Sequence, residues 1–176
     1  MWQLEDKMKK ILVLVLFLVS CNTEKSNQSF NIPVFDSNQA FTYLKEQCEF
    51  GPRNPGSDGA INFTNYLNSF LSDLSENIII QEFVYTEPIT NKERDGKNFI
   101  IQFNKEADYR LLLGAHWDTR ALSDQDESLD KQSLPVLGAN DGASGTAVLM
   151  QLSQILSANN PDIGVDIVFF DAEDGG

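Results

Sequence analysis

The sequence predicts an α/β fold, a sandwich in which helices flank a mixed, largely parallel central sheet. Segments with helical spacing of apolar residues alternate with extended apolar runs, which is typical of this class. The run VDIVFF, residues 165–170, is almost entirely β-branched or aromatic, as expected for a central strand covered on both faces. Polar residues gather where the predicted strands end, and in open α/β sheets ligands bind at that edge.

Two amphipathic helices are expected before the strands. Asp36 or Ser37 can cap the first helix, whose apolar face would hold Ala40, Phe41, Leu44 and Cys48. The tract GPRNPGSDG, residues 51–59, ends that helix because it contains three glycines and two prolines. The second helix has apolar residues at helical spacing, namely Phe63, Tyr66, Leu67, Phe70, Leu71 and Leu74.

After the second helix, the spacing of apolar residues changes from one typical of helices to one typical of strands. Three strands are predicted at residues 78–85, 98–103 and 109–115, separated by turn signals at Pro88, Gly96 and Asn104. A helix follows at residues 147–156, and the strand at 165–170 comes last.

Composition limits what the chain can do. With 176 residues, 41% of them apolar and 12 of them Phe, the chain can build the core of about one domain. The 13 Lys and Arg residues are outnumbered by 26 Asp and Glu residues, which gives a formal charge of −13. This charge argues against nucleic acid as a partner, because it would repel the phosphate backbone.

Residues 1–21 are predicted to be a lipoprotein signal region, residues 22–36 a flexible tether, and residues 37–176 a catalytic domain. MKKILVLVLFLVSC, from Met8, has a basic start and an apolar run too short to cross a bilayer as a helix, and Cys21 would be lipidated. Glu5 and Asp6 interrupt the basic start, which favours Met8 over Met1 as the first residue. A simple secretory signal cut nearby is the alternative. A lipid anchor would place the protein in a bacterial cell envelope, facing the periplasm or the surface.

Cys48 is then the one cysteine left in the mature chain, so no internal disulfide can form. It is interpreted as a buried small apolar residue. The alternative is a catalytic thiol, whose basic partner would have to be His116, the sole histidine.

Three polar clusters mark the predicted site: His116-Trp117-Asp118 after one strand, Asn140-Asp141 before a helix, and Asp171 to Asp174 after the last strand. Acidic clusters at one sheet edge repel one another unless a cation lies between them. A mixture of imidazole and carboxylate ligands suits zinc better than calcium or magnesium. Gly138, Gly142 and Gly145 would let the backbone turn and pack close to the site.

Each cluster has a simpler interpretation when taken alone. Asp141 could be no more than the N-cap of the following helix. The acidic stretch at residues 123–131 is interpreted as a solvated loop and is given no chemistry. The three clusters in their fixed order are what favours a metal site.

The motifs AHWDTR, GANDGASG and VFFDAED together resemble the zinc aminopeptidase superfamily, and in particular its glutaminyl-peptide cyclotransferase branch in bacterial lipoproteins. GPRNPGS is similar to an Arg-X-Pro-Gly-Ser segment of animal glutaminyl cyclases. The resemblance extends from about Cys48 to Gly176.

The resemblance implies that Asp141 and Asp174 are zinc ligands and that Glu173 is the general acid and base. In two-metal aminopeptidases the histidine equivalent to His116 is also a ligand, whereas in the one-zinc cyclases it lies nearby without binding. Asp118 would orient His116 or a neighbouring ligand, and Trp117 would line the pocket or belong to the core.

Two features depart from the family pattern. Many relatives have Glu-Glu where this chain has Glu173-Asp174. The family also takes a further acidic residue and a histidine from a region after this motif, so the sequence is interpreted as the N-terminal portion of the catalytic domain. Weak zinc binding and little or no activity are therefore expected for the 176-residue form.

The resemblance implies conversion of N-terminal glutamine to pyroglutamate, with release of ammonia, in glutaminyl peptides or proteins. One alternative is a two-zinc aminopeptidase that hydrolyses the first peptide bond. A second is a lipoprotein that keeps the scaffold for binding and has no catalytic activity. The oligomeric state and the identity of the peptides are not determined by the sequence.

Overall fold

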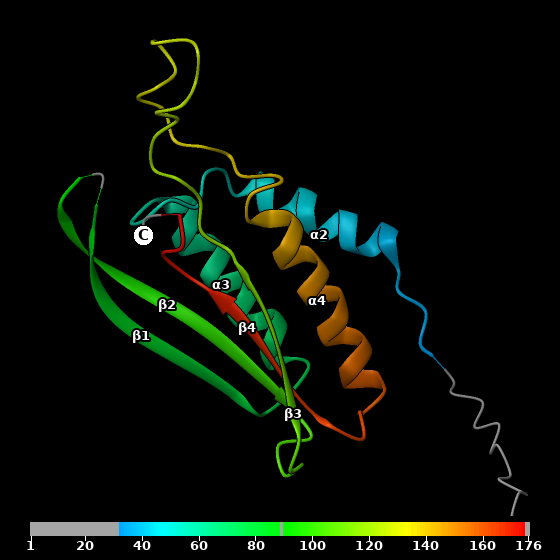
Figure 1. Cartoon of the computed structure of the whole chain (residues 1–176). Coiled ribbons are helices and arrows are strands. Elements are labelled where there is room, and N and C mark those ends of the chain that lie inside the picture. Colours follow the sequence, from blue (N-terminus) through cyan, green and yellow to red (C-terminus); the bar gives the residue numbers. More distant parts are fainter. Residues whose placement is uncertain (1–31, 89, 175–176) are drawn as a thin grey trace, which may run out of the picture. The chain divides into compact units, whose positions relative to one another are not determined.

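Three helices and four strands make up the part of the chain that the structure, a computed structural model, describes: residues 32–88 and 90–174 (Figure 1). In chain order they are α2 (Ser37–Glu49), α3 (Asp58–Ser72), β1 (Ile78–Glu87), β2 (Lys92–Phe103), β3 (Arg110–His116), α4 (Ala143–Ala158) and β4 (Gly164–Phe170). The predicted lipoprotein signal, with Cys21, lies outside the described residues. Within them, no helix is both long and apolar enough to cross a membrane.

Side-chain caps explain where the first two helices begin. The carboxylate of Asp36 accepts hydrogen bonds from the amides of Asn38 and Gln39, both at 3.0 Å, so the predicted cap is confirmed. Ser57 caps α3 in the same way. The predicted face of α2 was wrong in part: Phe41 is 59% exposed, while Ala40, Tyr43 and Gln47 are buried.

The strands lie in the order β1-β2-β4-β3. The sheet is mixed, as predicted, but the expectation of largely parallel pairing is wrong for these four strands, because only β3 and β4 are parallel. The reason is the long β1–β2 hairpin, since a short turn can join only antiparallel neighbours. Gly96 lies inside β2 opposite Phe83 instead of marking a turn, and the hairpin turns near Pro88.

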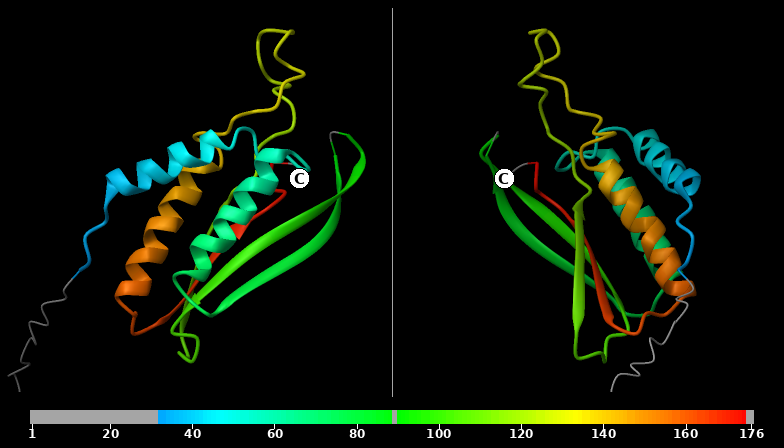
Figure 2. Two further views of the ribbon diagram at one scale, coloured as in Figure 1. Left: turned by 180° about the vertical axis from the view of Figure 1, so that it is seen from behind. Right: turned by 45° about the vertical axis from the view of Figure 1, so that its right-hand side comes forward.

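The helices cover one face of the sheet, as both views of Figure 2 show. Side chains of α3, α4, β2 and β4 form the core on that face, where Phe63, Leu67, Ile101, Met150, Ile167 and Phe169 are fully buried. The predicted central position of residues 165–170 is confirmed, because β4 lies between β2 and β3. The expected cover on both faces is not found in the described part, where Phe170, at the end of β4, remains 39% exposed.

Candidate metal centre

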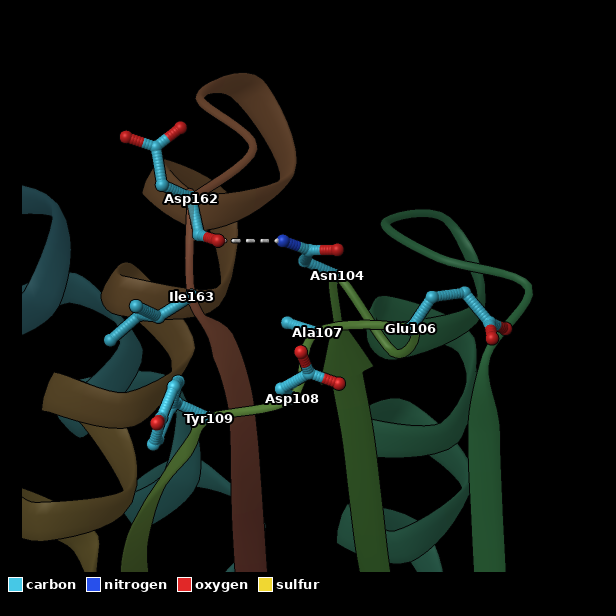
Figure 3. Close-up of a pocket in the computed structure, with 7 residues that line it drawn as sticks. All are labelled: Asn104, Glu106, Ala107, Asp108, Tyr109, Asp162 and Ile163. Carbon is cyan, nitrogen blue, oxygen red and sulfur yellow. Dashed lines mark hydrogen bonds between the residues drawn. The ribbon is translucent and has the colours of Figure 1, made fainter.

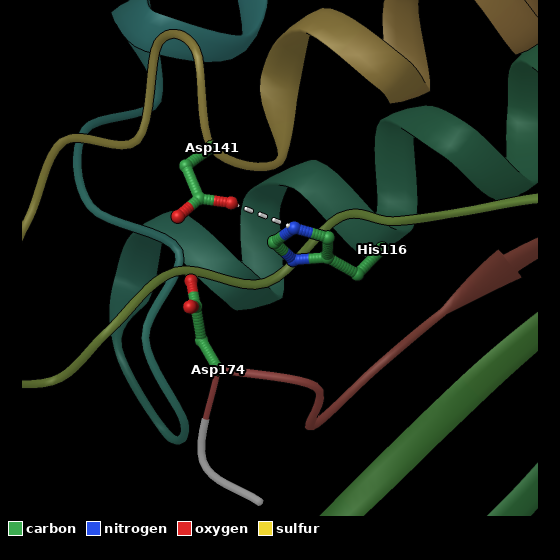
Figure 4. A group of neighbouring side chains, drawn as sticks. All are labelled: His116, Asp141 and Asp174. Carbon is green, nitrogen blue, oxygen red and sulfur yellow. Dashed lines mark hydrogen bonds and ion pairs between the residues drawn. The ribbon is translucent and has the colours of Figure 1, made fainter.

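The parallel pair β3 and β4 brings two of the predicted clusters to one edge of the sheet. His116 ends β3 directly beside Phe170, which ends β4. Helix α4 links these strands, and Asp141 lies just before its first residue. One ligand atom from each of His116, Asp141 and Asp174 lies within 4.8 Å of the others (Figure 4). The three motifs therefore meet at the carboxyl ends of the strands, where an α/β sheet places its ligands.

The imidazole of His116 lies between carboxylates. Its Nε2 atom is 2.9 Å from Asp141 Oδ1, and its Nδ1 atom is 3.4 Å from Asp118 Oδ1. The pKa of His116 is raised to about 9, mainly by the Asp118 carboxylate that faces Nδ1 and against the opposing effect of burial. The backbone oxygen of His116 accepts a hydrogen bond from Thr146 Oγ1 at 2.8 Å, which ties the end of β3 to α4.

Asp118 connects the end of β3 to the segment that leaves β4. Its carboxylate is fully buried and accepts the backbone N–H groups of Glu173 at 3.2 Å and Asp174 at 3.1 Å. Just before them Ala172 has φ 65°, a left-handed conformation that is uncommon for a residue with a side chain and is often found at functional sites. Asp118 thus fixes the backbone of the two residues predicted to do the chemistry, while it also faces the imidazole.

Asp141 reaches the site from a tightly packed loop. Its peptide bond with Gly142 is cis, and a Cβ atom on Gly142 would lie 2.4 Å from the backbone oxygen of His116 and 2.7 Å from its ring. Only glycine fits at that position. The N-cap of α4 is Gly142, without a side-chain cap, so the simpler interpretation of Asp141 as a helix cap is wrong. The Asp141 carboxylate is 69% exposed and turned toward the imidazole (Figure 4).

The electrostatics of the site suit a bound cation. The pKa of Asp174 is raised to about 6, first by burial and then by the charges of Asp141 and Asp118. A divalent ion between Asp141, Asp174 and His116 would relieve this repulsion. One imidazole and two carboxylates form a donor set that zinc accepts, so the residues present fit the predicted metal.

Glu173 lies beside this group and not within it. Its carboxylate is 65% exposed, and Oε2 is 3.9 Å from His116 Nε2. Neighbouring residues after a strand project in different directions, which separates this carboxylate from that of Asp174. The pair therefore offers one side chain to a metal and one to a molecule bound next to it.

Known proteins share both the sequence motifs and the fold. The model of the peptidase family M28 matches residues 98–176. A solved structure of a Bacteroides thetaiotaomicron glutaminyl cyclase bound to N-acetylhistamine is 36% identical, with a TM-score of 0.79 over 83% of this chain and 50% of that chain. The chain is thus a relative of peptidase family M28 and of glutaminyl cyclases. The predicted resemblance is confirmed.

Other proteins similar to this chain carry different names. A Zn-dependent exopeptidase from Parabacteroides distasonis is also 36% identical, with a TM-score of 0.79 over 82% of this chain and 49% of that one. A curated glutaminyl-peptide cyclotransferase from Bos taurus is 23% identical over 132 residues, which are 69% of this chain and 35% of the bovine protein. The chain spans about half the length of the solved structures. The comparisons therefore support a zinc-dependent enzyme of this superfamily without fixing which reaction it catalyses.

Two residues singled out from the sequence lie outside the metal-binding group. Trp117 is 3% exposed, packs 5.8 Å from the ring of Phe63 and donates its indole N–H to the backbone oxygen of Lys97 at 3.2 Å, so it belongs to the core. Cys48 is half-buried in the last turn of α2. Among the described residues no hydrogen bond or ion pair joins Cys48 to His116, so the structure offers nothing for a thiol–imidazole pair.

The sequence alone did not reveal the roles of Arg53 and Asp171. Arg53 is fully buried and donates hydrogen bonds to the segments on both sides of the site. Asp171 is not one of the three residues of the metal-binding group; it accepts the backbone N–H of Lys97 at 2.7 Å, and burial raises its pKa to about 7. Both residues belong to motifs noted in the sequence, Arg53 to GPRNPGS and Asp171 to VFFDAED. The spacing of residues in a motif does not show whether a charged side chain is buried or solvated.

Two hollows of the described surface lie outside the metal-binding group. The larger, of about 760 Å³, lies between α3 and the β1–β2 hairpin, with Trp117 and Asp171 in its lining. The smaller, of about 340 Å³, lies where β2 ends and β4 begins, at the other end of β4 from Asp174 (Figure 3). The candidate site is instead an open group of side chains at the sheet edge.

Proposed function

We propose that this chain forms the metal centre of a zinc-dependent glutaminyl cyclase, which converts N-terminal glutamine of peptides or proteins to pyroglutamate and releases ammonia. One observation carries the proposal: in a chain 36% identical to a glutaminyl cyclase, a His/Asp/Asp group lies beside the separate, exposed carboxylate of Glu173. That arrangement supplies a metal site and, next to it, a group able to move protons.

Asp141 and Asp174 would hold the ion. When bound, zinc supplies Lewis acidity that polarises the γ-carbonyl of the glutamine. His116 would act as a partner of Asp141, since its Nε2 atom is already within hydrogen-bonding distance of that carboxylate at 2.9 Å. Asp118 holds the imidazole from the other side and keeps the backbone of Glu173 in place.

Glu173 would move the proton. Its carboxylate takes a proton from the α-amine as that nitrogen attacks the γ-carbonyl carbon, and a C–N bond forms to close the five-membered ring. The bond to the side-chain nitrogen then breaks, and Glu173 returns the proton to the departing ammonia. The exposure of the Glu173 side chain supports this role, because the amine must approach it from solvent.

A two-zinc aminopeptidase is the second candidate, because a Zn-dependent exopeptidase matches the chain as well as the glutaminyl cyclase does. In that reaction His116 would be a ligand of a second ion, and Glu173 would take a proton from water as it attacks the first peptide bond. The two reactions use the same residues and differ in their products.

The test follows ammonia release from a Gln-initiated dipeptide, with zinc present and the complete gene product as enzyme. We expect ammonia without free glutamine, and a loss of about 10²- to 10⁴-fold in kcat for Glu173→Gln, since a positioned general base contributes about that much. Zinc binding should persist in this variant. Glu106→Gln, which changes an exposed carboxylate outside the metal-binding group, is the matched control.

Each alternative has its own result. Free N-terminal amino acid without stoichiometric ammonia would exclude the cyclase and favour the aminopeptidase. A protein that binds zinc but releases neither ammonia nor free amino acid, and whose zinc binding is the same in Glu173→Gln, would favour a non-catalytic binding lipoprotein.

We also propose that the protein is a lipoprotein of a bacterial cell envelope, anchored through Cys21. Support comes from the sequence alone, in the basic start and apolar run that precede this cysteine. Labelling of the protein with a radioactive fatty acid, absent from Cys21→Ser, would test the anchor; equal labelling of both would exclude it.

A further inference from the structure

Arg53 is a buried cation without an acid partner in the described part of the chain. Its side chain is 0% exposed, and its pKa is lowered by burial. All the hydrogen bonds of its guanidinium go to backbone oxygens: Nε to Trp117 at 2.9 Å, Nη1 to Gln47 at 3.1 Å and to Leu137 at 3.3 Å, and Nη2 to Gly138 at 3.0 Å. Burying a charge in this way costs stability, so packing alone does not explain the residue.

The acceptors lie in the segments that carry the metal-binding group. One acceptor is the backbone oxygen of Trp117, the residue that follows His116 and precedes Asp118 in the sequence. The backbone oxygen of Gly138 comes three residues before Asp141 and also accepts the N–H of Ala143, the first residue of α4. One planar group therefore fixes the strand end that bears the imidazole and the loop that bears the carboxylate.

Further contacts fix the guanidinium itself. The backbone N–H of Arg53 donates to the buried hydroxyl of Thr119 at 2.9 Å, and the guanidinium carbon lies 5.8 Å from the centre of the Phe63 ring. Gln47, whose backbone oxygen is one of the acceptors, donates its side-chain amide to the backbone oxygen of Ala143 at 3.0 Å. The end of α2, the tract GPRNPGS and the start of α4 are thus held together around one side chain.

We propose that Arg53 is a positioning residue that sets the distance between His116 and Asp141, and with it the affinity of the site for zinc. The inference rests on the proposed function only in taking these two side chains as part of the metal site. A lysine at this position would keep the charge but could not reproduce the rigid fork that reaches several acceptors in one plane.

The first measurement uses Arg53→Lys and needs no activity. His116 is the one histidine of the chain, so its imidazole ¹⁵N signals in the metal-free, 176-residue protein report on this site alone. We expect these signals to shift in Arg53→Lys while the protein still unfolds cooperatively. Zinc affinity, measured by competition with a chelator in both the 176-residue chain and the complete gene product, should fall about 10- to 100-fold, the usual loss when a residue that orients a metal ligand is changed.

Arg110→Lys is the matched control. Arg110 pairs with Asp166 at 2.6 Å between β3 and β4, and it lies at the start of β3, at the other end of that strand from His116. The variant Arg110→Lys should leave the His116 signals and the zinc affinity unchanged.

A second variant, Arg53→Ala, opens a cavity of the right shape for a guanidinium ion. Millimolar guanidinium should restore part of the lost zinc affinity, and methylammonium or urea at the same concentration should not. In the complete gene product at saturating zinc, kcat for ammonia release should fall in Arg53→Lys without a change in KM, because Arg53 does not touch substrate.

Wild-type zinc affinity and unshifted His116 signals in Arg53→Lys, with only a lower unfolding temperature, would overturn the proposal. Loss of cooperative unfolding in both variants would also count against it, since Arg53 would then be required for the fold itself. A wild-type protein that binds zinc but releases free amino acid would exclude the cyclase and leave the Arg53 inference to be judged by zinc affinity. A wild-type protein that binds no zinc would overturn both.

Discussion

Among single residues outside the metal-binding group, Asp171 has a carboxylate whose titration is strongly altered by burial. It follows β4 directly, and its carboxylate accepts the backbone N–H groups of Lys97 at 2.7 Å and Ala172 at 2.8 Å. Burial, the largest effect, and the charge of Asp118 together raise its pKa from 3.8 to about 7, against the opposing effect of the two backbone hydrogen bonds. This carboxyl group is thus still protonated in the folded protein at a pH where it is ionised in the unfolded chain.

The consequence is a stability that falls as pH rises from about 4 to about 7. In this window the folded state holds a proton on Asp171 that the unfolded state has lost, so raising the pH favours unfolding, by an amount of a few kcal/mol at most. We expect Asp171→Asn to flatten this slope in denaturant unfolding measured in metal-free buffer between pH 4 and 8.

Asp166→Asn is the contrasting variant, because the pKa of Asp166 is shifted in the opposite direction to that of Asp171. The hydrogen bond from Arg110 holds the pKa of Asp166 below its usual value, so the stability contributed by Asp166 is present above about pH 4 and is lost at lower pH. An unchanged slope between pH 4 and 7 in Asp171→Asn would show that Asp171 ionises normally in the folded protein.

The residues of the candidate site differ in how far the sequence predicted them. His116, Asp141 and Asp174 could be placed together because strand ends and helix starts of an α/β sheet share one edge. Arg53 could not, because its partners are backbone oxygens, and any sequence offers those. The role of a buried guanidinium therefore depends on which loops pass around it. The spacing of apolar residues predicts helices and strands but not the conformation of loops.

At the scale of elements, α3 is the helix that the sequence predicted best. Phe63, Leu67 and Leu71 are 0% exposed, as their spacing indicated, and they pack against the sheet. In α2 the same reasoning failed for Phe41, because α2 packs through Tyr43, whose ring contacts Phe70 of α3, and through the amide of Gln47, which donates to Ala143 of α4. A helix that docks partly through polar contacts has a weaker apolar signal than one that lies on a sheet.

Leu67→Ala tests the contribution of α3. Because Leu67 is fully buried, the variant should lower the free energy of unfolding by about 2 to 5 kcal/mol, from lost burial and the cavity that remains. Ile61→Ala, on the same helix but 54% exposed, should change it by less than about 0.5 kcal/mol. Denaturant midpoints measure both, and equal effects would show that α3 does not pack on the sheet as described.

At the scale of the whole molecule, β3 is an edge of the described sheet. It pairs with β4 on one side, and Leu111 and Leu112 are 48% and 61% exposed. An apolar strand at a sheet edge offers unpaired N–H and C=O groups to another chain. For the chain of 176 residues we therefore predict that this edge supports self-association.

We expect sedimentation velocity to detect concentration-dependent association of the 176-residue chain, and Leu112→Lys to reduce it, because a charge on an edge strand opposes pairing. Leu129→Lys adds the same charge at a residue that is 79% exposed in the acidic loop, and it should have no such effect. A wild-type chain that stays monomeric at every concentration would rule out this role of β3.

The sequence by itself determined the α/β class, the order of helices and strands, and which motifs meet at the candidate site, since these follow from periodicity, turn residues and residue types that are local. Only the tertiary structure decided that the helices cover one face, that β2 pairs antiparallel with β4, and that Asp118 and Arg53 hold the site. Those features arise from contacts between residues far apart in the chain. Their energies depend on burial and on backbone partners that no local pattern records.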